Sequence, residues 1–250
     1  MSEITSMVVP DELELKAFSF LFEAQPPEEI LQWAIENYGD KLGIVTSFQA
    51  SGMTILDMAV KINPNIRVLT LDTGRLPEET YGFMEEVQQY YGIKIDVIYP
   101  ETRDVQNLVS RHGINMFYRD HQLRLACCHA RKVLPLKKAL SNLDCWVSGL
   151  RRDQWASRAN TQKIEFDDKH DNIIKLNPLA DWTEDEVSAY IRRNNVPKHP
   201  LYAKGFKSIG CAPCTRAVEA GENMRAGRWW WEKNTAKECG IHCGIERRGF

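Results

Sequence analysis

The stretch Leu-Gly-Ile-Val-Thr-Ser-Phe at residues 42–48 begins the pattern that decides the fold. A short apolar run of this kind, followed by the small polar turn at 49–52, is typical of a buried strand that leads into a helix. Strands that alternate with helices predict an α/β fold, with a Rossmann-like parallel sheet and helices on both of its faces. The alternation continues with apolar runs at 66–71, 93–98 and 144–149 and with helical spacing at 53–62, 77–91, 102–112 and 120–140.

Patterns outside this alternation add to the sheet and cover it. Helical spacing at residues 11–23, and again from the Pro26-Pro27 pair to about residue 39, predicts two covering helices. Residues 173–179 predict an edge strand. The stretch that begins with Asp181 carries a capping pattern and predicts a helix through Ile191.

Composition indicates an ordinary soluble globular protein. The 250 residues include 32 basic and 34 acidic side chains, so the net charge of −2 gives no reason to expect nucleic acid or an anionic membrane as a partner. We expect no secretory signal and no transmembrane segment. The seven cysteines are an odd number, which favours the reducing cytoplasm over a disulfide framework.

Two pairs of cysteines indicate a metal site. Cys127 and Cys128 are adjacent, and Cys211 and Cys214 form a C-x-x-C pair far downstream. Either pair alone is consistent with buried packing or redox chemistry, but four thiolates in two pairs can close a tetrahedral site. The spacing leaves zinc and an iron–sulfur cluster open, since both accept four cysteines.

Positive charge surrounds these cysteines in the sequence. A structural metal site has no need of this charge, so we expect an anionic substrate beside the metal. The basic residues are Arg131, Lys132, Arg216, Arg225 and Arg228.

Three loops should lie at the carboxyl ends of the predicted strands, where ligands bind in such sheets. Residues 47–52 are rich in small and hydroxyl side chains and precede a helix, which suits a phosphate but also an ordinary strand–helix turn. The second loop is residues 72–75. The third, residues 149–158, carries Arg151, Arg152 and Arg158, whose guanidinium groups suit phosphate or sulfate oxygens; a solvated arginine loop is the alternative.

Four motifs in this chain occur together in one known family. They are Leu71-Asp72-Thr73-Gly74-Arg75, the cysteine set, the Arg-Trp-rich stretch at 225–231 and Glu238-Cys239-Gly240-Ile241-His242. On these motifs, the chain from about residue 42 to 242 resembles the assimilatory adenylyl-sulfate (APS) reductases. These are thioredoxin-dependent, cluster-containing relatives of the phosphoadenylyl-sulfate (PAPS) reductases. The resemblance implies an oxidoreductase with an adenine nucleotide alpha hydrolase-like fold and a mobile C-terminal tail that carries the nucleophile.

The resemblance also implies a reaction and a set of site residues. Cys239 attacks the sulfur of adenosine 5′-phosphosulfate, AMP leaves, and thioredoxin or a glutaredoxin-like reductant releases sulfite from the bound thiosulfonate, in sulfate assimilation and cysteine biosynthesis. His242 is the second catalytic candidate, and Cys127, Cys128, Cys211 and Cys214 hold a [4Fe-4S] cluster. The predicted substrate-binding residues are Ser47, Phe48, Gln49, Ala50, Leu71, Asp72, Thr73, Gly74, Arg75, Lys132, Arg151, Arg158, Arg225 and Arg228.

We expect three segments: covering helices at 1–40, a nucleotide- and cluster-binding α/β domain at 41–228 and the nucleophile-bearing tail at 229–250. Nearby cations lower the pKa of a thiol and neutralise the charge that the departing groups accumulate. We assign that neutralisation to Lys132, Arg158, Arg225 and Arg228. The cluster itself need not exchange electrons, because thiols can supply them; it can fix the position of a cation.

Three alternatives stay open. A reductase of the 3′-phosphorylated nucleotide, or an enzyme that accepts both nucleotides, has the same fold and chemistry. An ATP-dependent tRNA sulfur-transfer enzyme shares the fold, but its SGGxDS loop is not present at residues 47–52. A zinc-bound scaffold is the third. Cys243 lies outside the family pattern, and homo-oligomerisation is not decided by the sequence.

Overall fold

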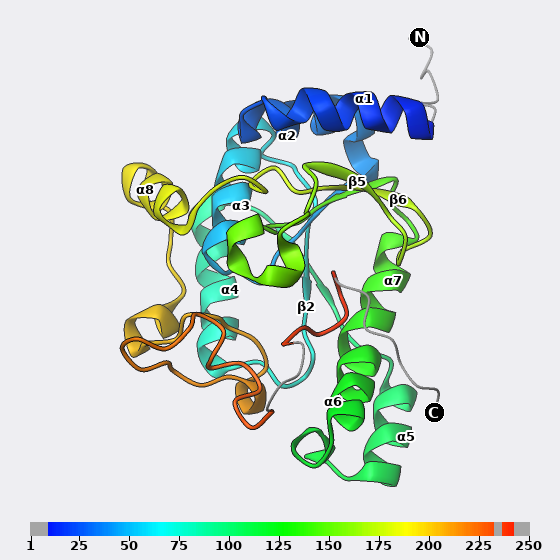
Figure 1. Ribbon diagram of the computed structural model, residues 1–250, viewed down its shortest axis with the longest axis vertical. Coiled ribbons are helices and arrows are strands. Elements are labelled where there is room, and N and C mark those ends of the chain that lie inside the picture. Colours follow the sequence, from blue (N-terminus) through cyan, green and yellow to red (C-terminus); the bar gives the residue numbers. More distant parts are fainter. Residues whose placement is uncertain (1–9, 233–236, 243–250) are drawn as a thin grey trace. The chain divides into compact units, whose positions relative to one another are not determined.

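The computed structural model describes residues 10–232 and 237–242 (Figure 1). Within these residues, no helix is long and apolar enough to cross a membrane. The strands are β1 (Leu42–Val45), β2 (Val68–Leu71), β3 (Ile95–Ile98), β4 (Cys145–Val147), β5 (Ile164–Asp167) and β6 (Ile173–Leu176). The α-helices are α1 (Glu12–Glu23), α2 (Pro27–Tyr38), α3 (Ala50–Ile62), α4 (Glu78–Tyr91), α5 (Thr102–His112), α6 (His121–Cys128), α7 (Leu134–Leu140) and α8 (Glu184–Asn194).

The strands form one sheet in the order β3-β2-β1-β4-β6-β5. Strand β4 pairs in parallel with β1 and with β6, and β5 pairs antiparallel with β6. The α/β fold predicted from the sequence is confirmed, although the sheet is mixed rather than wholly parallel. The prediction of an edge strand at 173–179 is wrong, because β6 lies between β4 and β5. Its near-continuous apolar run suits a strand that is buried on both faces of the sheet.

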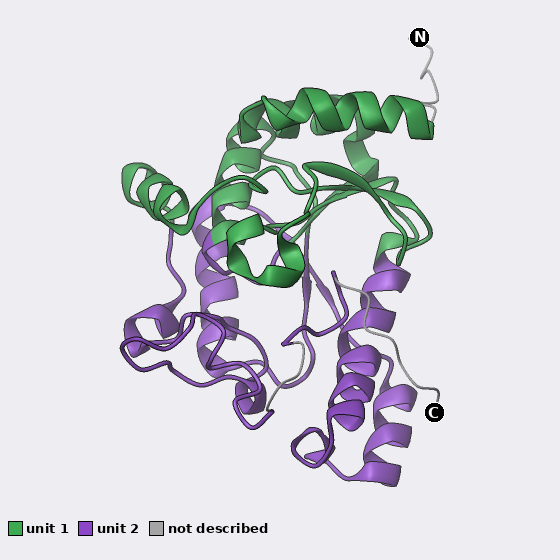
Figure 2. Cartoon of the chain, in the orientation of Figure 1, with its two compact units in different colours: residues 1–45, 51–68, 140–196 green, residues 46–50, 69–139, 197–250 purple. Residues whose placement is uncertain are grey.

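The chain divides into two compact units (Figure 2). Unit 1 comprises residues 1–45, 51–68 and 140–196, and unit 2 comprises residues 46–50, 69–139 and 197–250. The three segments expected from the sequence do not correspond to these units and stay a prediction.

In unit 1, the two predicted N-terminal helices are α1 and α2. Asp11 caps α1 through a capping box with Glu14, and Pro27 occupies the first position of α2, where its missing N–H is not needed. Phe22 and Trp33 join the two helices, with their ring centroids 5.1 Å apart. These aromatic side chains are therefore packing residues.

Elsewhere in unit 1, the buried helix α3 is hydrogen-bonded to Tyr190 of α8. Helix α3 is buried along most of its length. Its Asp57 accepts hydrogen bonds from Lys61 Nζ at 2.6 Å and from the hydroxyl of Tyr190 in α8 at 2.7 Å. Burial and the Asp57 carboxylate raise the pKa of Tyr190, so this phenol stays a donor.

In unit 2, one continuous helical rod carries the first cysteine pair. It runs from α6 through the π-helical turn η3 (His129–Val133) into α7, which confirms the predicted helix at 120–140. Asp120 caps its N-terminus by accepting from the N–H groups of Gln122 and Leu123. π-Helical turns occur frequently at functional sites.

Candidate active site

The four cysteines of the predicted metal site come together in unit 2. Cys127 and Cys128 end α6, whereas Cys211 and Cys214 bound the short helix η7 (Ala212–Cys214). Cys128, Cys211 and Cys214 are buried, and Cys127 is half-buried against them. The two cysteine pairs, which the sequence predicts to form one metal site, therefore lie together in the fold.

A cavity lies at this centre. All four cysteines line it, together with Arg75, Phe117, Arg124, Arg131, Lys132 and Pro213. No group of three or more His, Cys, Asp or Glu side chains within residues 10–232 and 237–242 is arranged to hold a single metal ion. Four thiols around a cationic cavity fit a multi-iron cluster, since each thiolate then ligates a different iron and the sulfurs need not converge on one point.

Burial makes these thiols costly to ionise without a compensating charge. It raises the pKa of Cys128 to about 12 and that of Cys214 to about 11. Cys211 differs: burial raises its pKa, but Lys132, the Thr73 hydroxyl and Arg228 together bring the net value below the ordinary one. Cys211 is therefore the buried thiol of the centre best prepared to act as a thiolate ligand.

Lys132 is a buried cation of this centre. It lies in η3 and is buried, with 9% of its surface exposed. Burial lowers its pKa, but the sulfurs of Cys211, Cys128 and Cys239 raise it, and the net shift is upward. Lys132 therefore stays charged beside the cysteine sulfurs.

Two arginines lie over the ring of a tryptophan beside the cysteines. Trp229 packs into the cysteine cluster. The centroid of its ring lies 4.3 Å from the guanidinium carbon of Arg124 and 4.6 Å from that of Arg228. Arg228 also donates to the carbonyl of Ile209 at 2.9 Å. Its guanidinium lies against Gly210, where an added Cβ would be 2.1 Å from Nη1. Glycine is thus required directly before Cys211 for Arg228 to keep this position.

The predicted loop at 72–75 is part of the same centre. It follows Leu71, the last residue of β2, and the Thr73 hydroxyl lies 3.2 Å from the sulfur of Cys211. Asp72 caps the loop by accepting from the Gly74 N–H at 2.7 Å, and Gly74 has a φ of +68°. Arg75 donates to the carbonyl of Ile114 at 2.7 Å. The loop therefore holds Thr73 against a cysteine, in addition to any contact with a substrate.

The loop at 47–50 is held mainly by its own side chains and by residues 202–209. Phe48 is buried with a φ of +56°, and Gln49 donates to the Ser47 hydroxyl at 3.0 Å. The Ala50 N–H donates to the hydroxyl of Tyr202 at 2.9 Å. An anion at this helix N-terminus would therefore meet one amide that already has a partner.

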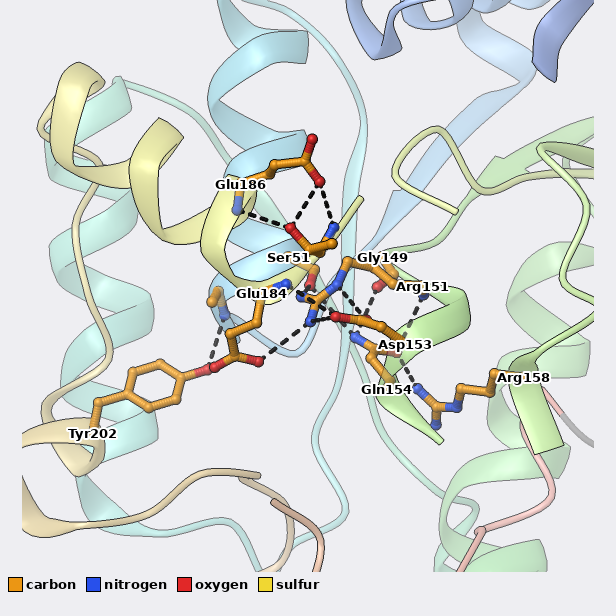
Figure 3. Close-up of polar contacts among 11 residues, drawn as sticks. Ser51, Gly149, Arg151, Asp153, Gln154, Arg158, Glu184, Glu186 and Tyr202 are labelled. Carbon is orange, nitrogen blue, oxygen red and sulfur yellow. Dashed lines mark hydrogen bonds and ion pairs between the residues drawn. The ribbon is translucent and has the colours of Figure 1, made fainter. Parts of the chain in front are cut away.

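In unit 1, the arginine loop is tied down at Arg151 (Figure 3). This side chain is buried, and its Nη1 donates to the Ser51 hydroxyl at 2.6 Å while its Nε donates to Asp153 at 2.9 Å. Asp153 in turn accepts from the N–H of Glu184, the first residue of α8, at 2.9 Å. Arg151 therefore fixes the loop to α3 and α8.

Gln154 connects this anchor to Arg158. Its Oε1 accepts from the backbone N–H of Arg151 at 3.3 Å and from Nη1 of Arg158 at 2.5 Å, as Figure 3 shows. The neighbouring Arg152 is directed elsewhere and forms an ion pair with Glu23. Of the three arginine side chains in the predicted loop, the guanidinium of Arg158 is thus the one that donates to Gln154.

The tail brings Cys239 to the cysteine centre in unit 2. Cys239 is half-buried and packs against the cluster of cysteine and aromatic side chains, and its sulfur interacts electrostatically with Lys132. His242 is half-buried three residues later. Arg225, which we assigned to substrate, forms an ion pair with Glu238 in this structure. Cys243 lies outside the described residues.

Arg124 is the important residue that sequence reasoning missed. Its side chain is fully buried, and its Nε and Nη2 bind the carboxylate of Glu232 at 2.9 and 3.0 Å. Helical spacing gave a signal for it, because Arg124 lies four residues before Cys128 on the same helix.

Comparison with known proteins identifies the class and then the family. The crystal structure of a phosphoadenylyl-sulfate (PAPS) reductase from Candida auris in a phosphate complex matches with a TM-score of 0.71 at 25% identity, over 84% of this chain and 99% of that chain. The fold is of the adenine nucleotide alpha hydrolase-like class. The family model for the phosphoadenosine phosphosulfate reductase domain matches residues 41–217. The chain belongs to this family.

Bacterial relatives extend the match over most of the chain. The adenosine 5′-phosphosulfate reductase of Pseudomonas aeruginosa (strain LESB58) is 42% identical over 236 residues, which cover 92% of this chain and 87% of that protein. The adenosine 5′-phosphosulfate reductase of Burkholderia cepacia is 45% identical over 203 residues, which cover 81% of each protein.

Proposed function

We propose that this protein reduces adenosine 5′-phosphosulfate to sulfite and AMP. The observation that carries the proposal is the position of Cys239, a candidate nucleophile, beside the buried cation of Lys132 and the four-cysteine centre. Relatives at 42% and 45% identity bear the name of this reaction, which supports an oxidoreductase of sulfate reduction. The six cysteines within the described residues are free thiols, which supports a reducing compartment such as the cytoplasm.

The first half-reaction is a transfer of the sulfonate group to Cys239. The thiolate attacks the sulfonate sulfur, an S–S bond forms, and the bond from that sulfur to the bridging oxygen breaks. AMP leaves with the electron pair of the broken bond, and Cys239 carries a thiosulfonate. Lys132 and Arg228 neutralise the negative charge that develops on the phosphate and sulfonate oxygens, a role that the sequence predicts for Arg158 as well.

The second half-reaction consumes a dithiol such as thioredoxin. One thiolate of the dithiol attacks the sulfur of Cys239, and sulfite leaves with the electron pair of the S–S bond. The second thiol of the reductant then resolves the mixed disulfide and regenerates Cys239. The dithiol supplies both electrons, so no other redox group is required for the balance.

The four cysteines fit a [4Fe-4S] cluster on their number, thiol chemistry and cationic cavity. Cys127, Cys128, Cys211 and Cys214 would hold it. When bound, the cluster supplies a fixed electrostatic field beside the substrate rather than electrons. Lys132, whose charge the buried sulfurs stabilise, is the residue on which that field would act.

An anaerobic sulfite-release assay tests the proposal. We expect reductant-dependent sulfite release from adenosine 5′-phosphosulfate and a lower kcat/KM with the 3′-phosphorylated nucleotide, with iron and sulfide quantified on the same sample. Preference for the 3′-phosphorylated nucleotide would favour the alternative that the Candida auris enzyme represents. Sulfite from neither nucleotide would exclude both reductases.

Gln154→Leu is expected to raise the KM for the nucleotide by about fivefold with kcat little changed. The substitution removes the acceptor that orients Arg158 but keeps the size of the side chain. Loss of a hydrogen bond of this kind costs about 1 kcal/mol, which corresponds to that factor. Initial-rate kinetics measure it.

Gln162→Leu is the matched control, because Gln162 bonds to Ser19 and to the carbonyl of Asn160, not to the arginine loop. An equal rise of KM in both variants would contradict the positioning role of Gln154.

A further inference from the structure

The two residues that precede Cys239 are held by two buried arginines. Nη2 of Arg225 donates to the backbone carbonyl of Lys237 and lies 3.4 Å from Oε2 of Glu238. The side chains of Arg225 and Glu238 expose 10% and 4% of their surfaces. Nη1 of Arg124 donates to the backbone carbonyl of Glu238. Arg225 and Arg124 thus make three contacts with the consecutive residues Lys237 and Glu238.

Arg124, one of the two arginines that make these contacts, is itself held in place. Arg124 is fully buried, paired with both carboxylate oxygens of Glu232 and stacked on Trp229. Burying the Glu238 carboxylate is costly without a cation beside it, so removal of Arg225 or of Glu238 weakens the charge compensation of the other. The peptide before Cys239 therefore has one strongly favoured position, in which the thiol packs against the cysteine centre.

We propose that Glu238 is a positioning residue for Cys239, and that Arg225 acts on the nucleophile through Glu238. This inference rests on the proposed function only in taking Cys239 as the nucleophile. The carboxylate holds the tail segment with Cys239 beside Lys132, and without it the segment leaves that position for part of the time. Arg225 therefore has a role in the tail that is separate from any contact with the substrate.

The reactivity of Cys239 toward iodoacetamide tests this without any nucleotide. In the cluster-loaded enzyme, Glu238→Ala is expected to raise the rate of Cys239 alkylation by roughly tenfold or more, the effect of losing a charge-assisted hydrogen bond. Mass spectrometry assigns the alkylated cysteine. Glu222→Ala is the control, because it removes the ion pair of Glu222 with Arg216 at 2.7 Å on the surface of the same unit. The control should keep the wild-type rate.

A double-mutant cycle separates the pair from general loosening of the tail. If Arg225 acts through Glu238, the variant with both Arg225→Met and Glu238→Ala is alkylated no faster than the faster single variant. Additive effects, or a wild-type alkylation rate in Glu238→Ala, would overturn the inference. Glu238→Gln, which keeps the shape of the side chain, serves if the alanine variant is not folded.

The same variants separate this inference from the proposed function. With labelled adenosine 5′-phosphosulfate and no reductant, the Glu238→Ala enzyme should form the thiosulfonate at least tenfold more slowly at saturating nucleotide, with the KM within twofold of wild type. Wild-type enzyme that acquires no label would refute the proposed function, while the alkylation result would still decide whether Glu238 positions Cys239. A changed KM with an unchanged saturating rate would overturn the positioning role.

Discussion

Cys239→Ser is expected to retain no label when it is incubated with labelled adenosine 5′-phosphosulfate in the absence of reductant, and to release no sulfite with it. The reaction needs a thiolate, and a serine hydroxyl beside Lys132 neither ionises near neutral pH nor forms the S–S bond of the intermediate. Mass spectrometry of the intact protein detects the sulfonate adduct directly. The loss of label should be complete, because Cys239 is the one further cysteine among the described residues that packs against the four-cysteine centre.

Cys243→Ser is the matched control for the nucleophile, since it removes the other tail thiol by the same substitution. This variant should acquire the label and hold a stable thiosulfonate. Label on Cys239→Ser and none on Cys243→Ser would reverse the assignment. If wild type releases sulfite without a reductant and Cys243→Ser does not, Cys243 is a resolving thiol that attacks Cys239.

Cys211→Ser is expected to lose the iron and with it the activity. Cys211 is the buried thiol with the lowered pKa, and it also contributes to the charge that keeps Lys132 protonated. Serine supplies neither a thiolate ligand nor that charge. The other three cysteines then lack the fourth ligand of the cluster, and Lys132 lacks the charge of Cys211. Iron and sulfide determination and the visible absorption spectrum measure the loss.

Cys145→Ala controls for the removal of a buried cysteine, because Cys145 is fully buried in β4 and burial raises its pKa well above the usual value. This variant should keep its iron. Full iron content and colour in Cys211→Ser would show that Cys211 is not a ligand.

The sequence was sufficient for those parts of the fold that repeat a local pattern. Apolar runs and helical spacing predicted β1 to β4 and the helices between them, because burial of an apolar run needs no information from distant residues. Strand β5 was missed because its Ile-Glu-Phe-Asp segment is short and polar on alternate positions, and its stability comes from antiparallel pairing with β6. Likewise, the apolar character of β6 did not show on which sides its neighbours lie.

The sequence predicted which chemical groups the candidate site contains, but not which carboxylates pair with its arginines. The four cysteines and Lys132 were found from spacing and charge, and the structure brings them together. For the arginines, composition could only indicate an affinity for anions. Arg151 is neutralised by Asp153 and Arg225 by Glu238, and which carboxylate a guanidinium meets depends on the tertiary fold. The internal partners of both arginines are therefore findings of the structure.

The π-helical turn η3 makes the length of the cysteine-bearing rod as important as its composition. A regular helix turns by about 100° per residue, and a π turn accommodates one residue more than an α turn. The orientation of α7 about its own axis, which buries Leu136 and Leu140 and exposes Leu134, therefore depends on the one extra residue in η3. A deletion or insertion of one residue between Cys128 and Leu134 would rotate α7 by about 100° and turn Leu136 and Leu140 away from their buried positions, so the length of this segment is constrained independently of its side chains.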